Sequence, residues 1–176
     1  MRIRRLAPPD RESLSDLLET NGTFAREEIE VALELIDGAA AGSRDYHVLV
    51  CELPDCCAGL AGYICFGPTP MTDGTWDLYW IASRGSARGR GVGTALVRAM
   101  ERELAGSGAR IVRIETSQLD EYQAARSFYA RLGYREVGRI RDFYRRGDDL
   151  VTLARRLDAV ADVGLGDASR ATESTS

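Results

Sequence analysis

The sequence predicts a single α/β domain in which a mixed β-sheet carries helices on both faces. Two observations support this fold class. Short apolar or alternating segments typical of strands are separated by longer segments with apolar residues at helical spacing. Their expected order is βααβββαβαββ, which joins some strands directly and others through a helix. The chain has 176 residues, 44% of them hydrophobic, which suits one domain with one core.

The N-terminal half predicts two helices between strands. The expected elements are a strand near 2–6, a helix starting at 8–10, a second helix, and strands at 46–52 and 57–66. Asn21 and Gly22 should end the first helix. Thr23 is expected to cap the second helix, with Glu27 and Glu28 in its first turn.

The C-terminal half alternates strands and helices. The expected elements are a strand at 75–82, a helix at 90–105, a strand at 110–116, a helix at 120–132, and strands at 135–143 and 149–156. Asp120 and Gln123 have the spacing of a capping box, and Gly133 suits a left-handed residue after the helix. We expect a domain over residues 1–157 and a disordered tail over 158–176, where small and polar residues dominate.

Composition restricts the kind of protein. The formal net charge of −4 argues against a nucleic-acid partner. We see neither a signal peptide nor an apolar run of transmembrane length, and therefore expect a cytoplasmic protein without a membrane partner. The four cysteines, Cys51, Cys56, Cys57 and Cys65, form no C-x-x-C pair and are expected to be reduced. With His47 as the single histidine, we expect no metal site.

A glycine-stepped basic turn precedes an amphipathic helix. It consists of Arg88, Gly89, Arg90, Gly91, Val92, Gly93 and Thr94. A strand, a turn with few side chains and a helix N-terminus together favour an anion, because free backbone N–H groups and the helix dipole meet there. The dipole contributes only about 0.3–1 kcal/mol, so Arg88 and Arg90 would share the binding of a phosphate or pyrophosphate. The alternative is a glycine turn that binds nothing.

Two other phosphate loops are excluded by spacing. A P-loop requires a lysine, and the chain contains none. A dinucleotide-binding fingerprint requires a glycine three residues after Gly91, and Thr94 stands there. The turn instead resembles the R/Q-x-x-G-x-G signature of the GCN5-related N-acetyltransferases, with Arg88, Gly91 and Gly93 at the three positions.

A second segment strengthens the resemblance. Residues 124–134 read AARSFYARLGY, which is similar to the family block A-x-x-F-Y-x-x-x-G-F/Y. The resemblance spans about 76–157 and implies the acetyltransferase fold, with acetyl-coenzyme A as cosubstrate and its pyrophosphate on the loop 88–94. It also implies that the backbone of Ile81 and Ser83 pairs with the pantetheine arm, and that the Ile81 N–H polarises the thioester carbonyl. Tyr122 departs from the pattern, because many members carry asparagine there.

Three side chains are candidates for catalysis. Asp77 lies eleven residues before Arg88, where several family members carry a glutamate that acts as general base. Glu115 is the second candidate because it lies near the end of a strand, where open α/β sheets place ligands. Tyr129 matches the family tyrosine that protonates the leaving thiolate. Each has a structural alternative: a solvated edge aspartate, an ion pair with an arginine, and a core tyrosine beside Phe128.

The acceptor is the least defined part of the prediction. Phe24, between the first two helices, and Asp142 and Tyr144, near the last turn, are the expected contacts. Asp148 and Asp149 suit an ordinary polar turn better, and Cys65 is discounted as a nucleophile because no partner is visible. The predicted function is transfer of acetyl from acetyl-coenzyme A to a primary amine, by direct attack in a ternary complex. A small-molecule amine is preferred; a protein N-terminus, a longer acyl donor, a homodimer and a non-catalytic coenzyme A sensor or scaffold stay open.

Overall fold

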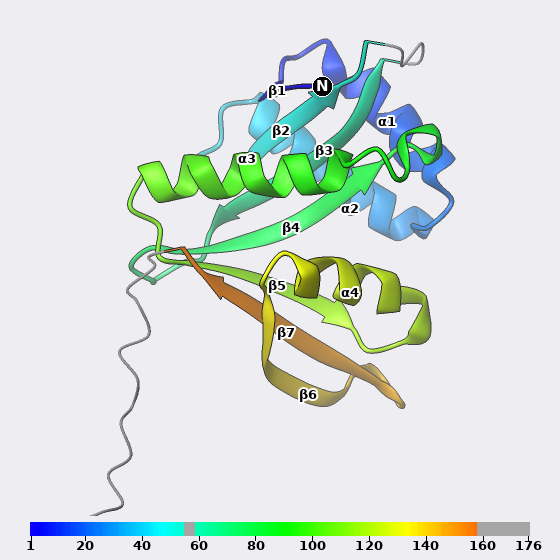
Figure 1. The fold of residues 1–176 in the computed structure, drawn as a ribbon. Helices are drawn as coiled ribbons and strands as arrows, with labels where there is room; N and C mark the ends of the chain where they lie inside the picture. The colour runs from blue at the N-terminus through cyan, green and yellow to red at the C-terminus, as the bar shows by residue number, and fades with distance from the viewer. Residues whose placement is uncertain (55–58, 158–176) are drawn as a thin grey trace, which may run out of the picture.

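The computed structural model describes residues 1–54 and 59–157. Seven strands form one sheet in the order β1-β2-β3-β4-β5-β7-β6 (Figure 1). The strands are β1 Arg2–Arg5, β2 His47–Glu52, β3 Leu60–Pro68, β4 Thr75–Ser83, β5 Ile111–Ser117, β6 Arg135–Arg145 and β7 Asp148–Arg156. The helices are α1 Asp10–Asn21, α2 Arg26–Ala40, α3 Val92–Gly106 and α4 Gln123–Arg131, with 3₁₀ turns η1 Gly85–Ala87 and η2 Asp120–Tyr122. The predicted fold class and element order are confirmed.

Helices cover both faces of the sheet. Leu14, Leu17 and Ile36 of α1 and α2 are fully buried in a core on one face. Leu96 and Met100 of α3 are fully buried in a second core on the other face, which α4 shares. Each helix therefore contributes one apolar face, as its residue spacing predicts.

The centre of the sheet opens between β4 and β5. These strands are parallel, and their pairing covers only Thr75–Asp77 against Ile111–Arg113. Beyond it the two strands diverge towards their C-terminal ends, as Figure 1 shows. On its other side β5 pairs with β7 along 111–117, and β4 pairs with β3 along 76–83. The divergence therefore leaves one edge of β4 without a neighbouring strand.

Helix starts differ from the sequence prediction. Thr23 does not cap α2; its N-cap is Ala25, whose N–H donates to the Glu28 carboxylate at 2.8 Å. The capping box at Asp120 is also wrong, because this residue opens a 3₁₀ turn and α4 starts only at Gln123. In both cases a turn of irregular backbone takes up residues that the periodicity assigned to the helix.

Other expectations are met or lie elsewhere. Gly133 has φ of +92°, as expected for a left-handed residue after α4. Cys51 and Cys65 are buried, and Cys65 carries a free thiol. The expectations for Cys56, Cys57 and the tail 158–176 lie outside the described residues. None of the helices within 1–54 and 59–157 is long and apolar enough to cross a membrane.

A buried carboxylate connects α3 to the C-terminal half of the sheet. Glu101 is 7% exposed and accepts two contacts from Arg155 Nη1, at 2.8 and 2.9 Å. It also accepts the Tyr134 hydroxyl at 3.1 Å and pairs with Arg98 at 2.7 Å. Side chains from α3, from β7 and from the turn between α4 and β6 thus contact one carboxylate. A buried carboxylate without such partners would cost free energy of folding.

Removing this carboxylate should destabilise the fold. We expect Glu101→Ala to lower the free energy of unfolding by about 3 kcal/mol, because Arg155 and Tyr134 lose their buried partner. Glu103→Ala is the matched control on the same helix, since its ion pair with Arg5 is exposed and should be worth less than about 1 kcal/mol. Urea unfolding of both variants measures the difference, and equal losses would contradict this role of Glu101.

Candidate active site

The glycine-stepped turn lies between β4 and α3 and presents unused backbone amides. Within it, Arg88 N–H donates to the Gly85 carbonyl and Arg90 N–H to the Ala87 carbonyl. Among the described residues, no backbone partner is present for the N–H groups of Gly89, Gly91, Val92, Gly93 and Thr94. Several amides at the start of a fifteen-residue helix therefore remain available to an anion.

The turn uses its glycines for two different reasons. Gly89 and Gly91 have φ of +74° and +79°, and an added Cβ would meet nothing within 4 Å at either position. These two residues follow a left-handed backbone that leaves the surface above them open. Gly93 has ordinary backbone, but its Cβ would lie 3.2 Å from the Phe128 ring. The third glycine thus permits close packing between α3 and α4, which the sequence motif did not reveal.

The open edge of β4 leads into this turn. Arg84 N–H donates to the Ala61 carbonyl of the neighbouring strand segment at 2.9 Å. Because alternate residues of a strand bond to opposite sides, the backbone groups of Ser83 and Ile81 point away from β3. They face the side where β4 and β5 diverge. The structure therefore brings the predicted Ile81 and Ser83 backbone next to the predicted anion loop.

The two candidate bases share one arginine. Asp77 is 8% exposed, and its two oxygens contact Arg113 at 2.6 and 3.1 Å and the Thr69 hydroxyl at 2.8 Å. Arg113 also lies 3.3 Å from Glu115, whose side chain is 43% exposed. The hydrogen bonds that Arg113 donates to the Asp77 carboxylate raise the pKa of Arg113 above its ordinary value. Asp77 is thus enclosed by partners, whereas Glu115 reaches solvent on the diverging part of β5.

Arg113 and Thr69 were not identified from the sequence as partners of Asp77. A signal for Arg113 existed, because Arg113 and Glu115 are two residues apart on one strand and share a face. Its contact with Asp77 depends on the register between β4 and β5, which the sequence does not contain.

Tyr129 lies in the core of the domain. It is 5% exposed and contacts Tyr134 and Phe128, with ring centroids 5.8 and 5.1 Å away. Burial raises the pKa of Tyr129 above its ordinary value. Phe128 is less buried and lies beside Gly93, at the start of α3. Of the two neighbours in the motif, the tyrosine is therefore the deeper one.

Phe24 and Trp80 pack against the core that α1 and α2 form with the sheet. Phe24 lies 6.1 Å from Trp80 of β4. Burial, and then the charges of Glu115 and Asp148, raise the pKa of Tyr144. The structure thus brings Tyr144 close to Glu115. Trp80, whose Nε1 is buried with no partner among the described residues, was not predicted.

Asp142 has a role within the last hairpin. Its backbone is left-handed, with φ of +52°, and its carboxylate accepts the Gly147 N–H. Its own N–H donates to the Asp149 carboxylate at 3.1 Å. Asp148 is 5% exposed and accepts the Ser117 hydroxyl. Asp142 and Asp149 thus brace the hairpin of β6 and β7, and Asp148 connects it to β5.

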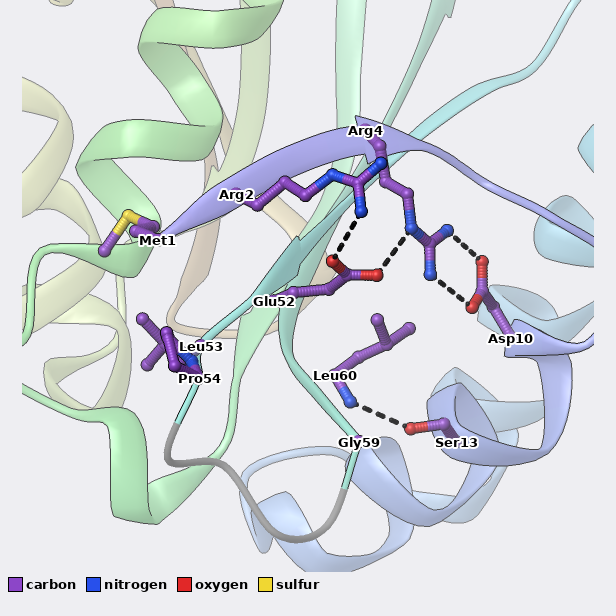
Figure 2. A pocket seen from close by; sticks show the side chains of 10 residues that line it. All are labelled: Met1, Arg2, Arg4, Asp10, Ser13, Glu52, Leu53, Pro54, Gly59 and Leu60. Atoms are coloured by element: carbon purple, nitrogen blue, oxygen red, sulfur yellow. Dashed lines mark hydrogen bonds and ion pairs between the residues drawn. The ribbon is translucent and has the colours of Figure 1, made fainter.

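The protein also has a hollow away from this opening. It has a volume of about 560 Å³ and lies at the β1 edge, lined in part by Arg2, Arg4, Asp10 and Glu52 (Figure 2). These charges pair with one another: Arg4 bonds to both carboxylates, and Arg2 lies 3.7 Å from Glu52. A pyrophosphate requires cations that are not already neutralised. The hollow is therefore a poor site for a nucleotide cosubstrate.

Comparisons with known proteins agree with this geometry. The model of a family described as an acetyltransferase (GNAT) domain matches residues 44–136. The chain is 34% identical to a protein of the GNAT family from Desulfovibrio desulfuricans, with a TM-score of 0.83 over 89% of this chain and 98% of that one. The comparison with curated proteins gives no match.

More distant structures share the fold. An aminoglycoside 6'-N-acetyltransferase complexed with coenzyme A has a TM-score of 0.70 at 21% identity, over 89% of this chain and 97% of that one. The ribosomal-protein-S18-alanine N-acetyltransferase from Escherichia coli has 0.69 at 18%, over 89% and 93%. The diverging strands and the amide-rich turn define an acyltransferase of the acetyltransferase fold. The chain belongs to the GNAT family, and the protein is an N-acetyltransferase.

Proposed function

We propose that the protein transfers an acetyl group from acetyl-coenzyme A to a primary amine by direct attack. The open edge of β4 that runs into the free amides of the turn carries this proposal. Backbone groups of Ile81 and Ser83 would pair with the amides of the pantetheine arm. The N–H groups of Gly89 and of residues 91–94, with the side chains of Arg88 and Arg90, would hold the pyrophosphate. The relative crystallised with coenzyme A supports this cosubstrate.

Deprotonation of the amine is the most costly requirement. An alkyl amine has a pKa of about 10.4, so making it neutral at pH 7 costs roughly 4–5 kcal/mol, at 1.36 kcal/mol per pKa unit. A carboxylate that is open to solvent and close to the amine can accept this proton. Glu115 meets this description better than Asp77, whose oxygens contact Arg113 and Thr69. We therefore assign the base to Glu115, and assign to Asp77 the task of holding Arg113.

The attack then proceeds without a covalent enzyme intermediate. The neutral amine would attack the thioester carbonyl, whose oxygen accepts the Ile81 N–H as negative charge develops. Collapse of the tetrahedral intermediate expels the coenzyme thiolate, which takes a proton from the Tyr129 hydroxyl. The nitrogen of the new amide gives up its extra proton, which restores the phenol. Cys65 is unsuited as a nucleophile, because burial raises the pKa of its thiol to about 12.

Replacing the phenol tests the leaving-group step. In Tyr129→Phe the ring contacts persist and the proton source is lost, so kcat should fall by about 10² or more, from the low end of the range for general acid catalysis, with little change in coenzyme affinity. Because the raised pKa keeps the wild-type phenol protonated up to about pH 10, its kcat should show no alkaline loss from this group below that pH. Stopped-assay rates from pH 6 to 9 measure both effects. A kcat equal to wild type would make Tyr129 a core residue.

A small-molecule amine is the proposed acceptor. Phe24, Trp80 and Tyr144 offer apolar surface for its body, and Glu115 offers charge for its ammonium group. Two of the more distant relatives are an aminoglycoside and a ribosomal-protein acetyltransferase. The acceptors to be assayed therefore include both small amines and a peptide N-terminus. A cytoplasmic location suits the proposed donor.

One assay tests the function directly. Amino sugars, polyamines, amino acids and a peptide with a free N-terminus are each incubated with acetyl-coenzyme A, and release of free thiol is followed. Turnover of a small amine above that of the peptide supports the proposal. Preference for the peptide would favour a protein N-terminal acetyltransferase. Tight coenzyme A binding by calorimetry with no turnover of any amine would contradict the proposed reaction and favour a sensor or scaffold.

A further inference from the structure

Two side-chain connections join α1 to the end of β4. The first is Arg84, the residue after β4, which is 7% exposed. Its Nε donates to the Leu60 carbonyl at 2.9 Å and its Nη2 to the Ser13 carbonyl at 3.3 Å. Its Nη1 lies 2.6 Å from the Asp16 carboxylate. These contacts hold the first half of α1 against β3 and the end of β4.

The second connection starts at Asn21, the last residue of α1. Its Nδ2 donates to the Ser83 carbonyl at 2.8 Å. The atom that faces Ser83 must be the amide nitrogen, because a backbone carbonyl can only accept a hydrogen bond. Ser83 belongs to the open edge of β4, since the Arg84 N–H bonds on the opposite side to Ala61. Asn21 thus touches the strand edge that would carry the acyl donor.

Asn21 directly precedes the connection between α1 and α2, residues 22–25. Gly22 turns the chain there with φ of +71°, and Phe24 lies 6.1 Å from Trp80 of β4. The connection therefore reaches from the open edge of β4 to the aromatic side chains on the proposed acceptor side. The Asn21 amide ties this connection to the donor edge of β4.

We propose that Asn21 is a positioning residue that couples donor binding to the order of the acceptor side; this inference rests on the proposed acetyl transfer. A donor paired with the backbone of β4 would fix Ser83. Through the Asn21 hydrogen bond, the fixed Ser83 orders residues 22–25 and with them Phe24. Without the hydrogen bond, the donor still binds, but the amine is held less well for attack.

Hydrogen exchange tests the coupling without relying on catalysis. Coenzyme A should protect the amides of residues 22–25 in the wild type but not in Asn21→Ala, while coenzyme A affinity stays within about threefold, or roughly 0.7 kcal/mol. Asn21→Asp retains the side-chain oxygen but cannot donate, so it should behave like the alanine variant. Thr20→Ala is the matched control, because the Thr20 hydroxyl bonds only to carbonyls within α1. Equal protection in wild type and Asn21→Ala would overturn the proposal.

Kinetics with the best amine of the panel give the second readout. We expect kcat to fall about tenfold in Asn21→Ala and Asn21→Asp, with the KM for acetyl-coenzyme A nearly unchanged, as misalignment predicts. A wild-type kcat in either variant would also overturn the proposal. The two proposals fail separately. An active wild type with no effect of Asn21 rejects only the coupling, whereas a wild type that binds coenzyme A and acetylates nothing rejects only the reaction.

Discussion

Gly91→Leu should weaken coenzyme A binding at least tenfold, or about 1.4 kcal/mol, while Gly108→Leu should leave it unchanged. Both glycines are left-handed, with φ of +79° and +83°, and neither would bring an added Cβ within 4 Å of another atom. The backbone strain of a side chain, roughly 1–2 kcal/mol, is therefore shared by the two variants. Only at Gly91 would the side chain occupy the surface above the free amides of the loop.

The pair separates affinity from stability. Melting temperatures should fall by similar amounts in both variants, because the strain has the same origin. Isothermal titration with coenzyme A should then differ between them, because Gly108 follows α3 at its far end. Equal dissociation constants for the two folded variants would remove the phosphate-binding role of the loop.

The proposed coenzyme site is easier to predict from the sequence than the proposed acceptor site, for a physical reason. The binding proposed at the loop from Arg88 to Thr94 would depend on backbone groups, and the glycines that permit this backbone lie within one short stretch of the chain. The order of the elements also follows from periodicity alone. The divergence of β4 from β5 does not, because it depends on a register between strands separated by α3.

Contacts between residues far apart in the sequence distinguish the two candidate bases. From the sequence, Asp77 is the first candidate for the base and Glu115 the second. Arg113 distinguishes them, because it donates hydrogen bonds to both oxygens of Asp77, whereas it lies 3.3 Å from Glu115, whose side chain is 43% exposed. Asp142 is a second example of a contact that the sequence does not predict. Its left-handed backbone and the hydrogen bond that it accepts from Gly147 depend on the conformation of the hairpin, which the acidic composition of this segment does not specify.

Glu115→Gln should cause the largest loss of activity. If Glu115 accepts the amine proton, kcat/KM at pH 7 should fall by about 10²–10⁴, the usual range for a positioned general base. Glutamine preserves the shape and can still accept a hydrogen bond from Arg113, so the fold should be little affected. At pH 9 more of the free amine is neutral in solution, and the variant should recover part of the loss.

Asp77→Asn should lower stability more than activity, in contrast to Glu115→Gln. Its carboxylate is 8% exposed and bonded to Arg113 and Thr69, so the variant should lose roughly 1–3 kcal/mol of stability. Activity per folded molecule should fall less than in Glu115→Gln, with no recovery at pH 9. Glu121→Gln serves as the control, an exposed carboxylate of η2 with no proposed contact to the amine.

The pH series decides between the two carboxylates and water. A loss of 10² or more in Asp77→Asn that recovers at high pH, with Glu115→Gln fully active, would return the base to Asp77. Full activity of both variants would reject a carboxylate base altogether. Ordered water would then have to take the proton from an amine that binds already neutral, and kcat/KM would follow the titration of the free amine alone. The assignment to Glu115 therefore depends on a pH-dependent loss confined to that position.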